Sequence, residues 1–113
     1  MQSFNSISKE NLAQRKTVHE ICRLFNKSPS KGNLKRIKEL CSHCGDGVII
    51  EAGFHCDYGG QIQIGDRTFI NINCTVLDAP ISEGAITIGS DCLIGPNVQL
   101  LAVSHAVNPI ERL

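Results

Sequence analysis

Aliphatic residues recur every six positions in the second half of the chain, and this period limits the fold more than any other feature of the sequence. An α-helix repeats about every 3.6 residues and a flat strand about every 2, so neither produces a period of six. A chain wound as a three-sided prism does, because each hexapeptide makes one short side and one corner. The sequence therefore predicts a mostly β fold, a parallel β-helix with the aliphatic side chains inside. The aliphatic positions are Ile64, Ile70, Val76, Ile88, Ile94 and Leu100.

A second column, of small or compact residues, follows the aliphatic column four positions later. The aliphatic register fails once, at Ser82, and we interpret residues 79–85 as a loop that leaves one corner of the prism. The chain has four phenylalanines, one tyrosine and no tryptophan, which suits a narrow prism filled by aliphatic side chains. An ordinary β-sandwich with fortuitous spacing is the alternative. The compact residues are Thr68, Cys74, Pro80, Cys92, Val98 and Ser104.

The first part of the chain shows helical periodicity instead. Ser8 is a candidate N-cap for a first helix, and a second helix is predicted from about Asn33 to Cys44. Two short amphipathic helices should pack on the first coil of the prism and cover its open edge. We therefore predict an N-terminal helical segment over residues 1–45 and a β-helix domain over residues 46–113. The apolar faces are Val18, Ile21, Cys22 and Phe25 in the first helix, and Leu34, Ile37, Cys41 and Cys44 in the second.

The number of coils is small for a repeat fold. We count little more than two coils between Gln61 and Val103, plus a partial coil before them, whereas repeat folds generally need about three units. A stack that stops there leaves strand backbone groups unpaired at its edge. We therefore expect either that a partner covers this edge or that the chain is a shortened form of a longer protein.

Charge and hydropathy exclude several classes of function. The chain has eleven acidic and eleven basic residues, so nothing in its charge predicts binding to nucleic acid or to an anionic membrane. No apolar run approaches the length of about 18 residues needed for a membrane span, and no secretion signal is recognisable. We predict a cytoplasmic protein whose six cysteines are reduced.

His105 lies where the six-residue period ends. An imidazole, with an ordinary pKa of about 6.5, is the natural general base at neutral pH. His105 stands one position past the compact column, so we predict that it points outward, into any groove between neighbouring subunits. The alternative is a surface histidine in a turn.

Asn71 and Asn73 alternate with Ile70 and Ile72, so they are predicted to face outward, and Asp78 follows them. Amide and carboxylate groups on a rigid strand can hold sugar hydroxyls through fixed hydrogen bonds. Asparagine also favours the tight corners of such a coil, because it tolerates left-handed backbone angles. Both interpretations remain open for Asn73.

Cys41 and Cys44 have the C-x-x-C spacing of a zinc site. Structural zinc needs four ligands, and no second pair follows; residues 55–57 (His-Cys-Asp) are the nearest candidates and lie in a predicted strand. A thioredoxin-like redox role lacks its βαβ context. We therefore predict that both thiols pack in the core and that no metal is bound.

Four segments taken together resemble the maltose and galactoside O-acetyltransferases, which are hexapeptide-repeat acyltransferases. The similarity runs from about Leu12 to the last residue and includes the two-helix preface. It implies a left-handed parallel β-helix, an exception to the usual right-handed crossover. It also implies a homotrimer that moves an acetyl group from acetyl-CoA to a sugar hydroxyl. The segments are Phe54–Gly59, Asn71–Asp78, Ile94–Val98 and Ser104–Pro109.

The same resemblance suggests roles for individual residues. The catalytic histidine of the family corresponds to His105, which would take the proton of the acceptor hydroxyl and return it to the CoA thiolate. Asn71 matches an acceptor-site asparagine, and Asp78 lies near an acidic acceptor-site position, although Ala79 follows it here. No cofactor-binding residue is assigned. Such a site works mainly by holding two substrates together between subunits.

The chain also departs from the family. The N-terminal segment lacks the tyrosine and aspartate that usually contribute to the acceptor pocket. The family continues for several coils beyond the histidine, and these build most of the acetyl-CoA groove and much of the trimer contact. We therefore expect weak or absent turnover from these 113 residues alone. The alternative function is non-enzymatic: a β-helical assembly or binding module that associates with a longer homologue.

Overall fold

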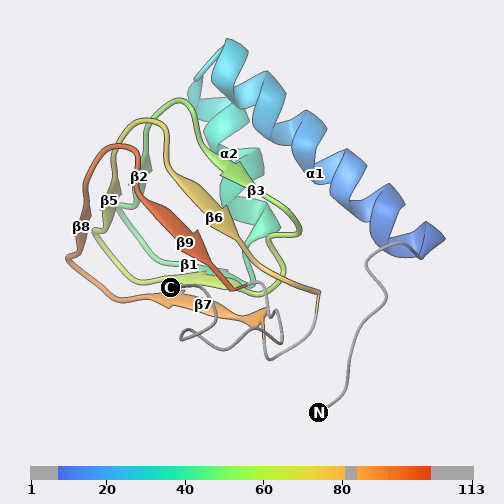
Figure 1. Cartoon of the computed structure of the whole chain (residues 1–113). Helices are drawn as coiled ribbons and strands as arrows, with labels where there is room; N and C mark the ends of the chain where they lie inside the picture. The colour runs from blue at the N-terminus through green and yellow to red at the C-terminus, as the bar shows by residue number, and fades with distance from the viewer. Residues whose placement is uncertain (1–7, 81–83, 103–113) are drawn as a thin grey trace, which may run out of the picture.

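A computed structural model of the chain describes residues 8–80 and 84–102. Within these residues, nine short strands form three parallel sheets, which are the three sides of a prism (Figure 1). The strands are β1 (His43–Cys44), β2 (Ile49–Ile50), β3 (His55–Cys56), β4 (Ile62–Ile64), β5 (Phe69–Ile70), β6 (Thr75–Leu77), β7 (Ile86–Ile88), β8 (Leu93–Ile94) and β9 (Gln99–Leu101).

Each sheet takes one strand from each of three successive coils, in the orders β1-β4-β7, β2-β5-β8 and β3-β6-β9. The chain is therefore a left-handed parallel β-helix, as predicted, and the β-sandwich alternative is wrong. The coils stack in register, so that Ile50, Ile70 and Ile94 lie above one another in one sheet. The predicted aliphatic column points inward; in the last coil Ile88 is buried, and Ile94 and Leu100 are partly buried.

The sequence predicts only a partial coil before Gln61, but the structure has a complete first coil, made of β1, β2 and β3. Cys44, Ile50 and Cys56 belong to the same inward column, at the same spacing of six. Ile64 follows Cys56 by eight positions instead of six, because the corner between β3 and β4 has two extra residues. This insertion breaks the period of six, so the sequence pattern did not show that the first coil is complete.

The corners of the prism use left-handed backbone angles. Arg67, Asn73, Asp91 and Asn97 have φ values of 58°, 58°, 57° and 61°, each one position before a residue of the compact column. Asparagine and aspartate tolerate this conformation better than most residues. The corner interpretation of Asn73 is therefore confirmed.

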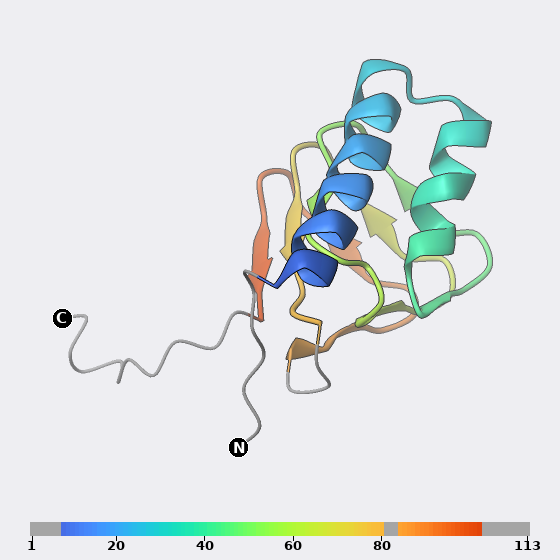
Figure 2. The ribbon, with the colours of Figure 1, turned by 90° about the vertical axis from the view of Figure 1, so that its right-hand side faces the viewer.

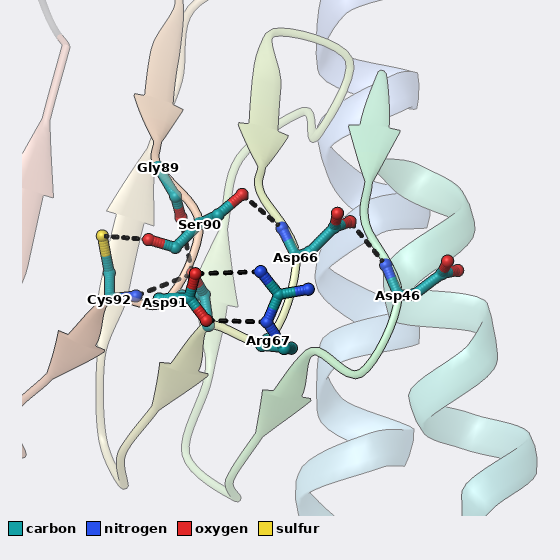
Figure 3. Close-up of polar contacts among 8 residues, drawn as sticks. Asp46, Asp66, Arg67, Gly89, Ser90, Asp91 and Cys92 are labelled. Atoms are coloured by element: carbon teal, nitrogen blue, oxygen red, sulfur yellow. Dashed lines mark hydrogen bonds and ion pairs between the residues drawn. The ribbon is translucent and has the colours of Figure 1, made fainter.

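One edge of the prism carries a ladder of polar side chains (Figure 3). The Asp46 amide donates to Asp66 Oδ1, and the Asp66 amide donates to Ser90 Oγ, each at 2.9 Å. Arg67 donates two hydrogen bonds to the Asp91 carboxylate, at 2.7 and 2.9 Å, and thereby lowers the pKa of Asp91. These contacts join each coil to the next and are exposed to solvent.

Two helices, α1 (Lys9–Lys27) and α2 (Lys31–Leu40), pack beside the first coil, as predicted (Figures 1 and 2). Ser8 caps α1 by accepting a hydrogen bond from the Asn11 amide. Neither of these described helices combines the length and apolarity needed to cross a bilayer. The helix residues that join the prism's core are Val18, Cys22, Phe25 and Ile37.

The predicted end of the second helix is wrong. The helix ends at Leu40, and His43 and Cys44 form β1 instead. The Ser42 amide donates to Ile62 O at 3.0 Å, and the Gly45 amide donates to Ile64 O at 2.8 Å. Hydrogen bonds to the second coil thus outcompete continuation of the helix. The division of the chain at residues 45 and 46 stays a prediction.

Substitutions of two adjacent isoleucines in β2 test which side chains of the prism point inward. Ile50 is 3% exposed and Ile49 is 50% exposed, so the same substitution probes the inside and the outside of one strand. Ile50→Ala is expected to lower the free energy of unfolding by about 2–5 kcal/mol, since it leaves a cavity. Ile49→Ala is expected to lower it by less than about 1 kcal/mol. Equal effects in urea denaturation would contradict the assigned register.

Candidate functional site

A cavity of about 520 Å³ lies between α1 and the outer side of β3. Its walls come from segments far apart in the sequence, which meet only because α1 packs on the first coil. Most of the lining residues are polar, whereas most of the surface they present to the cavity is apolar. The lining residues are His19, Arg23, Asn26, Gly53, His55, Cys56, Asp57 and Leu77.

Asp57 is the electrostatic centre of this cavity. Its Oδ1 atom lies 2.9 Å from His19 Nε2 and 3.6 Å from an Arg15 guanidinium nitrogen. In the described part of the chain, Arg15 Nε is buried without a hydrogen-bond partner. Arg23 also lines the cavity and pairs with Glu20 at 2.7 Å. The Asp57 carboxylate therefore faces one guanidinium group and one imidazole.

Asn26 fixes the far wall of the cavity. Its side-chain oxygen accepts from the amides of Gly53 and Phe54, at 2.8 and 3.1 Å, and its Nδ2 donates to Phe54 O at 3.0 Å. These three hydrogen bonds clamp the end of α1 to a corner of the first coil. A wall held in this way keeps the neighbouring groups in place, as a binding site requires.

The cavity suits a small polyhydroxylated molecule. Asp57 can accept hydrogen bonds, and Arg23 can donate them. The exposed imidazole of His55 can do either, and Leu77 supplies an apolar wall. A few fixed polar groups beside apolar surface are typical of small-molecule sites. Sequence reasoning missed this cavity, although Asp57 lies in a segment that carried the family resemblance.

Asn71 does not line the cavity. It follows β5 at a corner, is partly exposed, and its Oδ1 accepts a hydrogen bond from the Ile72 amide at 2.8 Å. The expected alternation fails after Asn71, because the chain turns there and leaves Ile72 exposed. The role of Asn71 in substrate binding stays a prediction.

Asp78 has a structural role. It is 1% exposed, and its Oδ1 accepts from the amides of Tyr58 and Gly59 at 2.9 and 3.0 Å. Its Oδ2 accepts from the Gln61 amide at 3.1 Å. The carboxylate thus satisfies the backbone of the long corner in the first coil. A role in substrate binding stays a prediction and would compete with these three bonds.

The structure does not bring the predicted site residues together. Asn71 and Asp78 stand at different corners of the prism, after β5 and β6 respectively. His105 and the rest of its motif lie outside the described residues. The general-base role of His105 therefore stays a prediction.

The C-x-x-C pair belongs to the core. Cys41 and Cys44 are partly buried and pack against the hydrophobic cluster, as predicted. Burial raises the pKa of the Cys41 thiol to about 12 and also raises that of Cys44. Over residues 8–80 and 84–102, no group of three or more histidine, cysteine or acidic side chains is placed to hold a metal ion.

The outer face of the β2-β5-β8 sheet carries an apolar ladder. Ile49, Phe69 and Leu93 stack in register across the three coils. Ile49 is half exposed, and Leu93 is 83% exposed. Outward positions of a solvated sheet are usually polar, so this ladder is a candidate interface.

No family model matches the chain. Two curated relatives are nodulation protein L of Rhizobium meliloti and the galactoside O-acetyltransferase of Escherichia coli. The first is 38% identical over 76 residues, which are 67% of this chain and 39% of the relative. The second is 35% identical over 72 residues, which are 64% of this chain and 34% of the relative.

Two solved structures match nearly the whole chain. One is a hexapeptide-repeat acetyltransferase of Vibrio cholerae in complex with acetyl-CoA, with a TM-score of 0.79, 32% identity and coverage of 98% of this chain. The other is a maltose O-acetyltransferase of Clostridium difficile, with a TM-score of 0.78 and 96% coverage. Its 23% identity makes it evidence for the fold alone. The chain spans 58–59% of these structures and well under half of the two curated relatives.

Removing the Asp78 carboxylate tests its structural role. Asp78→Ala leaves three backbone amides without their acceptor and is expected to lower the free energy of unfolding by at least about 3 kcal/mol. Asp78→Asn keeps the shape and loses one acceptor, so it should fall between Asp78→Ala and wild type. Asp91→Ala removes an exposed carboxylate and serves as the control. Thermal and urea denaturation measure all three, and a wild-type stability for Asp78→Ala would contradict the role.

Proposed function

The chain belongs to the hexapeptide-repeat acyltransferases, and from this membership we propose that it acts in acetyl-CoA-dependent O-acetylation of a sugar. The observation that carries the proposal is the match of the prism and both helices to an acetyltransferase that was solved with acetyl-CoA. Acetyl-CoA is a co-substrate in this proposal, and no described residue is assigned to bind it.

In the proposed reaction, His105 is the general base. Its imidazole takes the proton of an acceptor hydroxyl as that oxygen attacks the thioester carbonyl of acetyl-CoA. The carbon–sulfur bond breaks, and the CoA thiolate then takes the proton from the imidazolium. The rate gain comes mainly from holding both substrates with the base in place.

We propose the cavity beside Asp57 as part of the acceptor site. Its carboxylate, guanidinium and imidazole groups suit hydroxyls, and the clamp made by Asn26 holds its wall. Asn71 remains a second proposed acceptor contact, from a neighbouring corner. Asp78 supports the acceptor side by holding the corner of the first coil and need not touch the sugar.

The proposal includes a homotrimer in the cytoplasm. The apolar ladder of Ile49, Phe69 and Leu93 is a described surface that a second copy could cover. Covering it would remove exposed apolar area from water, which favours association. All six cysteines are free thiols in the structure, in keeping with a reducing compartment.

Substitution of the proposed base tests the chemistry. His105→Ala is expected to lower the rate of acetyl transfer by about 10²–10⁴-fold, the usual contribution of a positioned general base. Release of the CoA thiol with a panel of galactosides and glucosides measures it. His43→Ala, which removes an exposed histidine of β1, is the control. Wild-type turnover by His105→Ala would contradict its role.

The same assay tests the cavity with His55→Ala, which removes an exposed imidazole from its lining. Loss of one hydrogen bond is expected to raise the KM for the sugar by about 2–10-fold and to leave the KM for acetyl-CoA unchanged. An unchanged KM for the sugar would exclude His55 from acceptor binding. Acetyl transfer that is absent from the wild-type chain, alone or co-expressed with a full-length homologue, would instead favour the assembly-module alternative.

A charge on the apolar ladder tests the assembly. Leu93→Asp is expected to reduce the oligomer to a monomer, because a carboxylate would be desolvated in the contact. Thr87→Asp, at an exposed position of the same coil on another sheet, should leave the oligomer intact. Light scattering coupled to size-exclusion chromatography measures both. A trimer that survives Leu93→Asp would place its interface elsewhere.

A further inference from the structure

We propose that Cys22 and Cys56 are a dithiol that peroxide converts to a disulfide, which ties α1 to the first coil of the β-helix. Their Sγ atoms lie 3.9 Å apart, one on the helix and the other on β3. The side chains are 1% and 2% exposed and belong to the hydrophobic core. A modest approach of the two sulfur atoms would bring them to the bonding distance of about 2 Å.

The two thiols have different chemical characters. The hydrogen bond from the Cys56 thiol lowers the pKa of Cys22, against the opposing effect of burial. The same hydrogen bond, together with burial, raises the pKa of Cys56. Cys22 is therefore the partner that carries the thiolate and reacts first, and Cys56 is the resolving thiol.

The cavity can admit a small oxidant to the neighbourhood of the two thiols. Cys56 lines it, between the exposed His55 and the half-buried Asp57. Hydrogen peroxide is little larger than water and can enter this opening, next to the wall behind which both sulfur atoms are buried. Bulky disulfide reagents cannot, because neither sulfur is at the surface.

The reaction balances with peroxide as the only oxidant. The Cys22 thiolate attacks one peroxide oxygen, the oxygen–oxygen bond breaks, and hydroxide leaves, so Cys22 becomes a sulfenic acid. The Cys56 sulfur then attacks Cys22 Sγ, the sulfur–oxygen bond breaks, and water leaves with the Cys56 proton. The hydroxide takes up the proton that Cys22 released. Two thiols are oxidised to one disulfide, and one peroxide is reduced to two waters.

The other thiols are arranged differently. Three other thiols of the described residues donate hydrogen bonds to backbone carbonyl oxygens. Cys41 donates to Ile37 O, Cys74 donates to Ile72 O and Gly95 O, and Cys92 donates to Ser90 O. The pair at Cys22 and Cys56 is the only sulfur–sulfur hydrogen bond among the described side chains. A disulfide here would be a transient, oxidant-dependent state, as is usual for cytosolic proteins that form one.

Mass spectrometry of the native protein tests the proposal without any assay of acetyl transfer. The folded chain is treated with one equivalent of hydrogen peroxide and then alkylated with N-ethylmaleimide under denaturing conditions. We expect a loss of about 2 Da before alkylation, and after it two fewer alkylated thiols than in the untreated protein. Proteolysis should yield one cross-linked peptide that joins Cys22 to Cys56. The thermal midpoint should rise by on the order of 10 °C and return after reduction.

Matched variants separate the pair from the other cysteines. Cys22→Ala and Cys56→Ala should each abolish the cross-link, whereas Cys74→Ala, another buried position, should keep it. Circular dichroism confirms that each variant is folded. The proposal is overturned by a link between Cys41 and Cys44, by sulfinic acid without a link, or by no reaction in the folded wild-type protein.

Discussion

Register between coils is the constraint on which the rest of this structure depends. Parallel hydrogen bonds place each coil directly on the one before, so every position of one coil has the same orientation in the next. The inward column of isoleucine and valine follows from this stacking. The outward positions stack as well, and this stacking produces both the apolar ladder through Phe69 and the surface on which α1 forms its cavity.

Much of the prism could be predicted, because a period of six has few structural solutions. The first coil was predicted only in part, since the two extra residues between Cys56 and Ile64 shift the register. The end of α2 was ambiguous for another reason. Apolar residues three apart, such as Cys41 and Cys44, suit a helix face and a prism side equally well. Only the hydrogen bonds to the second coil decide between them.

The polar residues were harder to interpret than the apolar ones. A polar side chain in a tight corner can serve a ligand or the backbone, and the sequence shows only the residue type. Asn73 and Asp78 both serve the fold: one adopts a left-handed corner, and the other accepts three backbone hydrogen bonds. The cavity escaped prediction because His19 and Asp57 are 38 positions apart and meet only through the packing of α1.

The packing of α1 links stability to the candidate site. Arg15, His19, Cys22 and Asn26 recur at the helical spacing of four, three and four residues, so they lie along one side of α1, where Cys22 also belongs to the apolar face. Each of them contacts the first coil: two through Asp57, one through Cys56 and one through the backbone near Phe54. Residues that hold the helix thus lie in or beside the cavity wall. A change that loosens α1 therefore also reshapes the cavity, and a bond that fixes α1 also fixes its shape.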